Sequence, residues 1–187
     1  MRCFIAIAIS DEIRKAIGSI IEKLGPGQKG LRWTTPENIH ITLKFLGETD
    51  EKVVPDIKAR LSSICSNSIP FTLNIHGTGV FPNPKHPNVL WVGIDKSEEM
   101  KKLNMLIEGS LSELGFEKET REFSPHLTIG RVKDRKGIEP VIKGLYEFNE
   151  TFLGTIHANE VLLMKSVLKP AGAEYSKVAV FKLSSDN

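Results

Sequence analysis

The chain has 187 residues, of which 40% are hydrophobic and 26% charged, a balance typical of a globular protein and not of a disordered one. Lys and Arg number 25 against 23 Asp and Glu, and this formal net charge of +2 excludes a general polyanion binder while allowing a local basic site. The two cysteines, Cys3 and Cys65, are too few for a disulfide framework, so we expect a protein of the reducing cytoplasm.

The apolar start of the chain predicts a buried strand over residues 3–9. It is not expected to be a signal peptide, because it lacks a clear cleavage site and meets acidic Asp11 and Glu12 at once. No stretch approaches the ~18 apolar residues of a membrane span. We therefore expect a protein without a membrane partner.

Periodicity and turn residues predict the remaining elements in chain order. Helical spacing indicates helices over residues 11–24, about 51–66, 97–114 and 139–146. Strands are expected over residues 39–46, 71–76, 80–81, 89–94, 125–132, 161–168 and 175–183. Three prolines within residues 82–88 exclude regular structure there. Since strands outnumber helices and several neighbours look hairpin-linked, the predicted class is α+β with mainly antiparallel pairing.

One short pattern occurs twice. His40-Ile41-Thr42-Leu43 recurs as His126-Leu127-Thr128-Ile129, each on a predicted strand, after a proline turn and after a helix. The economical interpretation is two similar halves, related by a pseudo-two-fold, that each contribute one His-x-Thr strand.

Histidine and threonine in this pattern favour chemistry at a phosphate. Residues two apart on a strand share a face, so His40 lies with Thr42 and His126 with Thr128. One neutral imidazole can take a proton from water while the other, protonated, gives a proton to a departing sugar oxygen. The threonine hydroxyls can donate to the non-bridging oxygens without a metal.

A zinc site is the rival use of two histidines, but such sites usually need three or four ligands. The other histidines, His76, His86 and His157, are expected in a strand edge, a proline loop and a turn, away from the motif. We therefore expect no metal.

The two motifs resemble those of the two-histidine (2H) phosphoesterases, above all the RNA 2′,3′-cyclic phosphodiesterases, historically called 2′-5′ RNA ligases. The resemblance covers nearly the whole chain, including residues 2–7, 37–47, 81–84, 90–93, 124–131, 165–166 and 172–175. It implies one bilobal domain over residues 1–187, with a central cleft between two antiparallel sheets and helices outside. It also implies hydrolysis of RNA 2′,3′-cyclic phosphate ends to 2′-phosphates with no metal or nucleotide cofactor, with His40 as proton donor and His126 as proton acceptor.

Two cationic residues near the motifs, Arg131 and Lys44, are expected to have different roles. Arg131 is a candidate phosphate-binding residue, because a guanidinium matches phosphate geometry. Strand parity nevertheless turns it away from His126 unless Gly130 introduces a bulge. By strand alternation Lys44 lies on the same face as Thr42, but we expect it to be a solvated lysine at the cleft rim.

Aromatic residues are candidates for stacking on a base at a single-stranded RNA end. Trp33, Phe123 and Tyr175 are the candidates, although each is more often a packing residue. Phe45 and Trp91 are core residues by their pattern.

Two alternative functions stay open. A ligase could run the same chemistry with a 5′-hydroxyl in place of water, but the chain has neither a K-x-D-G motif for a nucleotidylated lysine nor a P-loop. Residues 25–30 match G-x-G-x-x-G, but a helix precedes them and an extended segment follows, so they are expected to be a loop and not a dinucleotide-binding motif. A binding module could recognise RNA or nucleotide without turnover. The sequence has no coiled-coil heptad repeat and no uncovered apolar helix that would indicate a subunit interface, so we expect a monomer.

Overall fold

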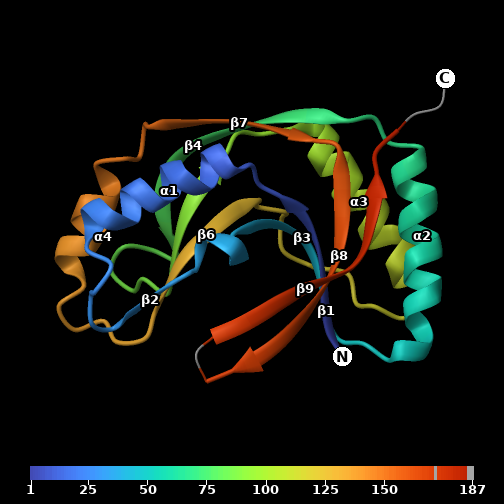
Figure 1. Ribbon diagram of the computed structural model, residues 1–187, viewed down its shortest axis with the longest axis horizontal. Helices are drawn as coiled ribbons and strands as arrows, with labels where there is room; N and C mark the ends of the chain where they lie inside the picture. The colour runs from blue at the N-terminus through green and yellow to red at the C-terminus, as the bar shows by residue number, and fades with distance from the viewer. Residues whose placement is uncertain (171, 185–187) are drawn as a thin grey trace.

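Nine strands form one continuous antiparallel sheet in the computed structural model, which describes residues 1–170 and 172–184 (Figure 1). The strands are β1 (Arg2–Ala8), β2 (Leu31–Trp33), β3 (His40–Glu48), β4 (Phe71–Phe81), β5 (Val89–Ile94), β6 (His126–Val132), β7 (Phe152–Ala158), β8 (Glu160–Lys169) and β9 (Gly172–Lys182). The helices are α1 (Asp11–Leu24), α2 (Val54–Ser66), α3 (Glu98–Ser112) and α4 (Glu139–Tyr146), with short 3-10 turns at Pro36–Asn38 and Glu51–Val53. The α+β class with antiparallel pairing is confirmed.

The helices lie where apolar periodicity predicts them, because their ends carry capping residues. Ser10 accepts a hydrogen bond from the backbone N–H of Ile13 at the start of α1, and Ser97 accepts one from that of Met100 in α3. Gly25, at a φ of 93°, ends α1 in a conformation that side chains disfavour. Helix α1 buries its isoleucines, and α3 buries Met100, Leu103, Ile107 and Leu111.

Glycine explains two of the places where the strands differ from the predictions. Residues 71–76 and 80–81 belong to one strand, β4, which continues through Gly77 (φ 75°) with a register shift against β5. Strand β7 was not predicted, because Gly154 interrupts its alternation and the strand pairs only with β4 at the sheet edge. His157 lies in this strand and not in a turn.

The sheet consists of two groups of four strands that meet at one point. The groups β7-β4-β5-β6 and β3-β1-β8-β9 are joined by the single registered pair Ile41↔Leu127. The two sheets expected from the sequence are therefore joined edge to edge, and strand β2 pairs with β6 near the joint.

Each group of strands is covered by a helix that, in the sequence, directly follows a strand of the other group. Helix α1 follows β1 in the chain but packs against β7 and α4, while α3 follows β5 but packs against β3 and α2 (Figure 1). One hydrophobic cluster runs through both groups, from Ile5 and Ile41 to Leu90 and Leu127. None of the helices in the described ranges has the length and apolar character of a membrane span.

Candidate active site

The four motif side chains form one patch on the face of the sheet that β3 and β6 share. Ile41 and Leu127 are 0% exposed and fix the opposite face in the core. Counted from this pair, the antiparallel direction of the strands places His40 across from Thr128 and Thr42 across from His126. Each imidazole therefore has a hydroxyl from the other half next to it.

Both imidazoles are held by the same backbone contact. His40 Nδ1 lies 2.7 Å from the carbonyl oxygen of Asn38, and His126 Nδ1 lies 2.8 Å from that of Ser124. A carbonyl oxygen can only accept, so each Nδ1 carries a hydrogen and donates it. Each Nε2 is consequently the nitrogen left for chemistry, as a base when the ring is neutral and as an acid when it is charged.

Aromatic rings fix the planes of the two imidazoles. The His40 ring stacks on Phe4, with centroids 4.7 Å apart, and meets the edge of Tyr175 at 5.3 Å. The His126 ring lies edge-to-face with Phe81 at 5.0 Å. The Nε2 atoms of both rings therefore have a defined direction before any ligand binds.

Burial lowers the pKa of His40 below its ordinary value, and the positive charges of Arg131 and His126 lower it further, against the raising effect of the Asn38 carbonyl. Burial also lowers the pKa of His126, with Arg131 again adding to the effect against the Ser124 carbonyl. Both shifts favour the neutral form of the rings in the free protein, whereas a nearby anion would favour the protonated form.

A β-bulge brings Arg131 to this patch. Leu90 pairs with Gly130 and Trp91 with Thr128, so that Ile129 is an extra residue in β6. Ile129 and Gly130 are both buried, and Arg131 emerges on the face of Thr128. The bulge that the sequence analysis required for a phosphate contact is present.

A matching bulge in β3 overturns two sequence expectations. Ile5 pairs with Lys44 and Ala6 with Thr42, so the extra residue is Leu43. Lys44 was expected in solvent but is 5% exposed, and its Nζ donates to Glu108 Oε2 at 2.6 Å and to the carbonyl of Glu117 at 2.7 Å. Phe45 was expected in the core but is 70% exposed. Both expectations were wrong because they carried strict alternation through the bulge.

The other aromatic candidates divide by what they touch. Trp91 is half-buried and pairs with Thr128, so it lies on the site face beside Phe81 and not in the core as expected. Trp33 donates its indole N–H to the carbonyl of Gly25, and Phe123 packs partly buried against the core. Of the three expected stacking residues, Tyr175 is the one whose ring contacts a motif histidine.

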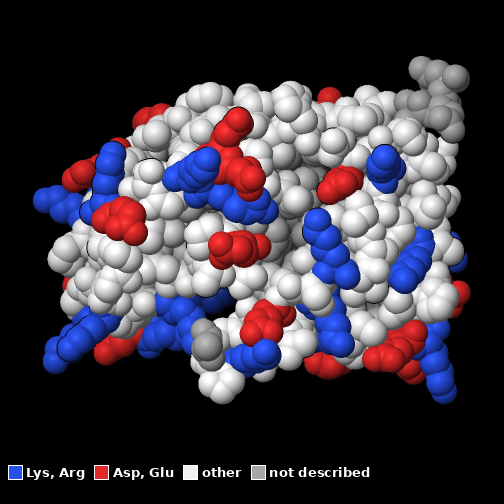
Figure 2. All heavy atoms as spheres, in the orientation of Figure 1, with Lys and Arg blue, Asp and Glu red and all other residues white. Residues whose placement is uncertain are grey.

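The hairpin of β8 and β9 is tied down beside the patch. Arg32, which pairs with Arg131 across β2 and β6, donates from Nη2 to the carbonyl of Pro170 at 2.9 Å. Asn38 donates from Nδ2 to the carbonyl of Ala173 at 2.8 Å. Figure 2 shows Lys and Arg side chains gathered at the lower left, around a hollow between the body and this hairpin.

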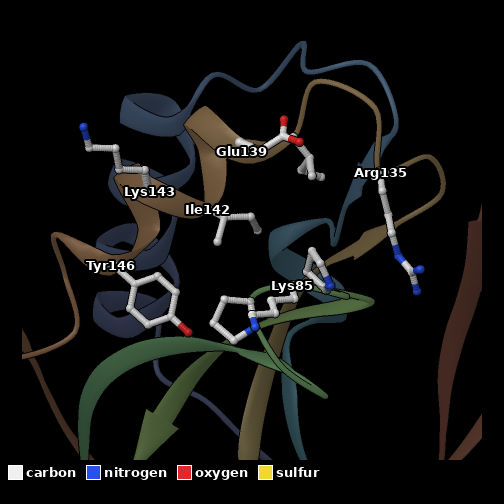
Figure 3. Close-up of a pocket in the computed structure, with 9 residues that line it drawn as sticks. Lys85, Arg135, Glu139, Ile142, Lys143 and Tyr146 are labelled. Atoms are coloured by element: carbon white, nitrogen blue, oxygen red, sulfur yellow. The ribbon is translucent and has the colours of Figure 1, made fainter.

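A separate hollow of about 370 Å³ lies between α4 and the proline turn (Figure 3). Its labelled lining residues are Lys85, Arg135, Glu139, Ile142, Lys143 and Tyr146. None of the five candidate residues named from the sequence lines it. Within the described ranges, no three His, Cys, Asp or Glu side chains gather closely enough to hold a metal ion.

Comparison with known families decides what kind of protein carries this patch. The model of the family described as "LigT like Phosphoesterase" matches residues 7–91 and then again residues 92–175. The chain belongs to the LigT-like phosphoesterases. Each of the two matches contains one His-x-Thr strand, β3 in the first and β6 in the second. The resemblance drawn from the two motifs and the expectation of a phosphoesterase are both confirmed.

Named relatives of this phosphoesterase align over most of its length. An RNA 2′,3′-cyclic phosphodiesterase of Archaeoglobus fulgidus is 36% identical over 182 residues, covering 97% of this chain and 100% of the relative. One from Thermotoga maritima is 39% identical over 133 residues, 71% of each chain. The crystal structure of TT0787 of Thermus thermophilus superposes with a TM-score of 0.86 at 27% identity over 100% of both chains. E. coli LigT complexed with 3′-AMP shares the fold, with a TM-score of 0.79 at 23% identity over 98% of both chains.

Proposed function

We propose that this phosphoesterase hydrolyses 2′,3′-cyclic phosphate ends of RNA to 2′-phosphates by metal-independent acid–base catalysis with His40 and His126. The observation that carries the proposal is the pair of imidazoles on neighbouring strands, each with Nδ1 bound to a carbonyl and Nε2 left for proton transfer. Relatives named RNA 2′,3′-cyclic phosphodiesterase support the substrate class.

The reaction is an in-line displacement at phosphorus. His126 Nε2 takes a proton from water as the water oxygen bonds to phosphorus, and the bond from phosphorus to the 3′-oxygen breaks. His40 Nε2 gives its proton to that 3′-oxygen, and exchange with solvent then resets both rings. Because the pKa of His40 is lowered in the free protein, the negative charge of the bound phosphate is what retains the proton on His40.

Three further residues stabilise the charge that develops on phosphorus. The Thr42 and Thr128 hydroxyls lie beside the opposite imidazoles and donate to the non-bridging oxygens. Arg131 reaches the same face through its bulge and supplies a guanidinium.

The enzyme acts in this proposal as one bilobal unit over residues 1–187 and as a cytoplasmic monomer. Two free and buried cysteines, Cys3 and Cys65, agree with a reducing compartment. The partner is RNA or an oligonucleotide that carries a 2′,3′-cyclic phosphate end.

Phosphorus NMR of a defined 2′,3′-cyclic oligonucleotide tests the proposal, because the product isomer identifies the leaving oxygen. We expect the 2′-phosphate. His40→Ala and His126→Ala should each lose most turnover, and the double variant should be little worse, since groups that act in one step are not additive. His157→Ala, which removes an exposed histidine on β7, is the matched control and should retain full activity.

Three results would contradict the proposal. A 3′-phosphate product would show that the 2′-oxygen leaves and not the 3′-oxygen. Joined strands in the presence of a 5′-hydroxyl RNA, without hydrolysis, would identify a ligase. Binding of the cyclic substrate with no product would identify a binding module.

A further inference from the structure

The hollow of about 370 Å³ between α4 and the proline turn has an apolar floor. Ile138 and Ile142, at 2% and 7% exposure, line it on the side of α4, and Pro84 and Pro87 line it on the side of the turn. The ring of Tyr146 lies at its edge and is 36% exposed (Figure 3). An aromatic ring beside apolar contacts is a surface on which a nucleobase can stack.

The rim of the hollow is mainly cationic. Lys85, Arg135 and Lys143 lie on it, and Glu139 is the one acidic residue among the described residues that line the hollow. All four side chains are exposed. This excess of positive charge is local, because the whole chain has a formal net charge of only +2. The rim is therefore complementary to an anionic ligand.

Arg135 is held in place on this rim by the proline turn. Its Nη2 donates to Oδ1 of Asn88, at 2.7 Å. A guanidinium has five N–H donors, so this bond leaves most of them for a phosphate. Figure 3 shows Arg135 and Lys143 on opposite sides of the hollow, so that an anionic chain lying across it meets a cation on each side.

The hollow adjoins the motif patch at its Arg131 end. The proline turn follows Phe81, whose ring meets that of His126, and it ends before Val89, which pairs with Arg131. Arg135 is four residues beyond Arg131, a length of chain that spans at most about 14 Å. A nucleotide chain bound at the two histidines can therefore continue past Arg131 into the hollow.

We infer that this hollow binds the RNA nucleotides on the 5′ side of the cyclic phosphate end, with their phosphates against the cationic rim and a base against Tyr146. The inference rests on the proposed function and adds a second contact region for the substrate. A 2′,3′-cyclic phosphate occupies both ribose hydroxyls of the terminal nucleotide, so the rest of the RNA extends only from its 5′-oxygen. A basic groove with an aromatic ring is a common binding surface for a single strand. An acidic peptide would complement the rim equally well, but it would have no link to the motif patch.

Substrates of two lengths separate this contact from the chemistry. Adenosine 2′,3′-cyclic phosphate has only the reacting nucleotide, whereas a single-stranded hexanucleotide with the same end carries further nucleotides on its 5′ side. For wild type we expect a lower KM for the hexanucleotide. Lys85→Gln/Arg135→Gln/Lys143→Gln should raise that KM roughly tenfold, since each exposed ion pair contributes modestly. The kcat for both substrates and KM for the adenosine substrate should stay near wild type, because the hollow does not contact the reacting atoms.

The salt dependence of KM provides a second readout. Each phosphate contact to a single strand contributes about 0.7 to the slope of log affinity against log salt concentration, so the triple variant should reduce this slope for the hexanucleotide by about 2. Lys52→Gln/Lys101→Gln/Lys102→Gln is the matched control, because it removes the same charge from exposed lysines of α3 and of the 3-10 turn before α2. It should leave the slope and both KM values near wild type.

Two single variants test the rim and the ring with opposite signs. Glu139→Gln removes the negative charge from the rim and should lower KM for the hexanucleotide about twofold. Tyr146→Leu keeps apolar bulk but loses the ring, and it should raise that KM roughly fivefold to a hundredfold, the worth of one stacked base. Neither variant should change kcat or KM for the adenosine substrate, which also shows that the variants fold.

The outcomes distinguish failure of this inference from failure of the proposed function. If wild type hydrolyses neither substrate, the proposed function fails and the inference fails with it. If wild type hydrolyses both and the triple variant behaves like the matched control, the hollow does not bind RNA, although the phosphodiesterase activity stands, and an acidic peptide becomes the better occupant. Equal impairment of both substrates by the triple variant would also overturn the inference, because the effect would not depend on the 5′ nucleotides.

Discussion

Replacing Lys44 by methionine should destabilise the protein far more than the loss of a surface lysine does. The Lys44 side chain is 3% exposed and that of Glu108 is 14% exposed, with 2.6 Å between their charged atoms. At an effective dielectric constant of about 20, this pair attracts by about 6 kcal/mol, which the cost of desolvating two ions largely offsets. The intact pair is therefore nearly neutral for stability, whereas breaking it is costly.

The magnitude follows from what Lys44→Met leaves behind. Removal of one partner from a buried pair costs about 3–5 kcal/mol. Glu108 keeps some exposure and a hydrogen bond from the backbone N–H of Glu119, so the lower end applies, about 3 kcal/mol. In a chain of this length that lowers Tm by about 6–12 °C. The double variant Lys44→Met/Glu108→Met removes the partners of two backbone groups, the Glu117 carbonyl and the Glu119 N–H, and should lose about 1–2 kcal/mol.

Urea unfolding followed by circular dichroism measures these differences. Lys102→Met, on the exposed side of α3, is the control and should stay within about 0.5 kcal/mol of wild type. The reasoning is refuted if Lys44→Met matches that control, or if the double variant is less stable than Lys44→Met alone.

Three further predictions concern the proposed chemistry. The profile of kcat/KM against pH should be a bell centred below pH 6.5, because burial lowers the pKa of both His40 and His126. Arg131→Gln should move both limbs of the bell to higher pH, because it removes a positive charge that lowers the pKa of both histidines. Limbs that stay fixed would contradict the electrostatic role of Arg131. Chelators should leave the rate of hydrolysis unchanged. Inhibition by EDTA that one divalent ion reverses would contradict the metal-independent mechanism with two imidazoles. A substrate with a much better leaving group should rescue His40→Ala far more than His126→Ala, measured as kcat, while the opposite pattern would exchange the two roles.

Sequence alternation predicts this site correctly up to the bulges and wrongly beyond them. His40, Thr42 and their counterparts in β6 precede the extra residues, so the parity argument holds for them. Lys44 and Phe45 follow the bulge, and Leu43 is an ordinary strand residue that gives no sign of being unpaired. Only in β6 does a glycine beside the bulge provide such a signal.

Other features of the site have no side-chain signature at all. The carbonyl oxygens that set the orientation of both imidazoles belong to the backbone of Asn38 and Ser124, and any residue supplies such an oxygen. The joining of the two strand groups depends on one registered pair between distant segments, which local periodicity cannot specify. The partners of each histidine therefore become visible only in three dimensions.

The exchange of helices between the two strand groups has a consequence for synthesis on the ribosome. Strand β1 needs β8 on one edge, and α1 needs β7 and α4 on its apolar face, although β1 and α1 are made first and those partners near the end. At about 5–20 residues per second, the nascent chain waits roughly 7–30 s with these surfaces uncovered. Neither half can therefore fold to completion while the other is missing, and a chain that stalls before β8 exposes an unpaired apolar edge that chaperones must shield from aggregation.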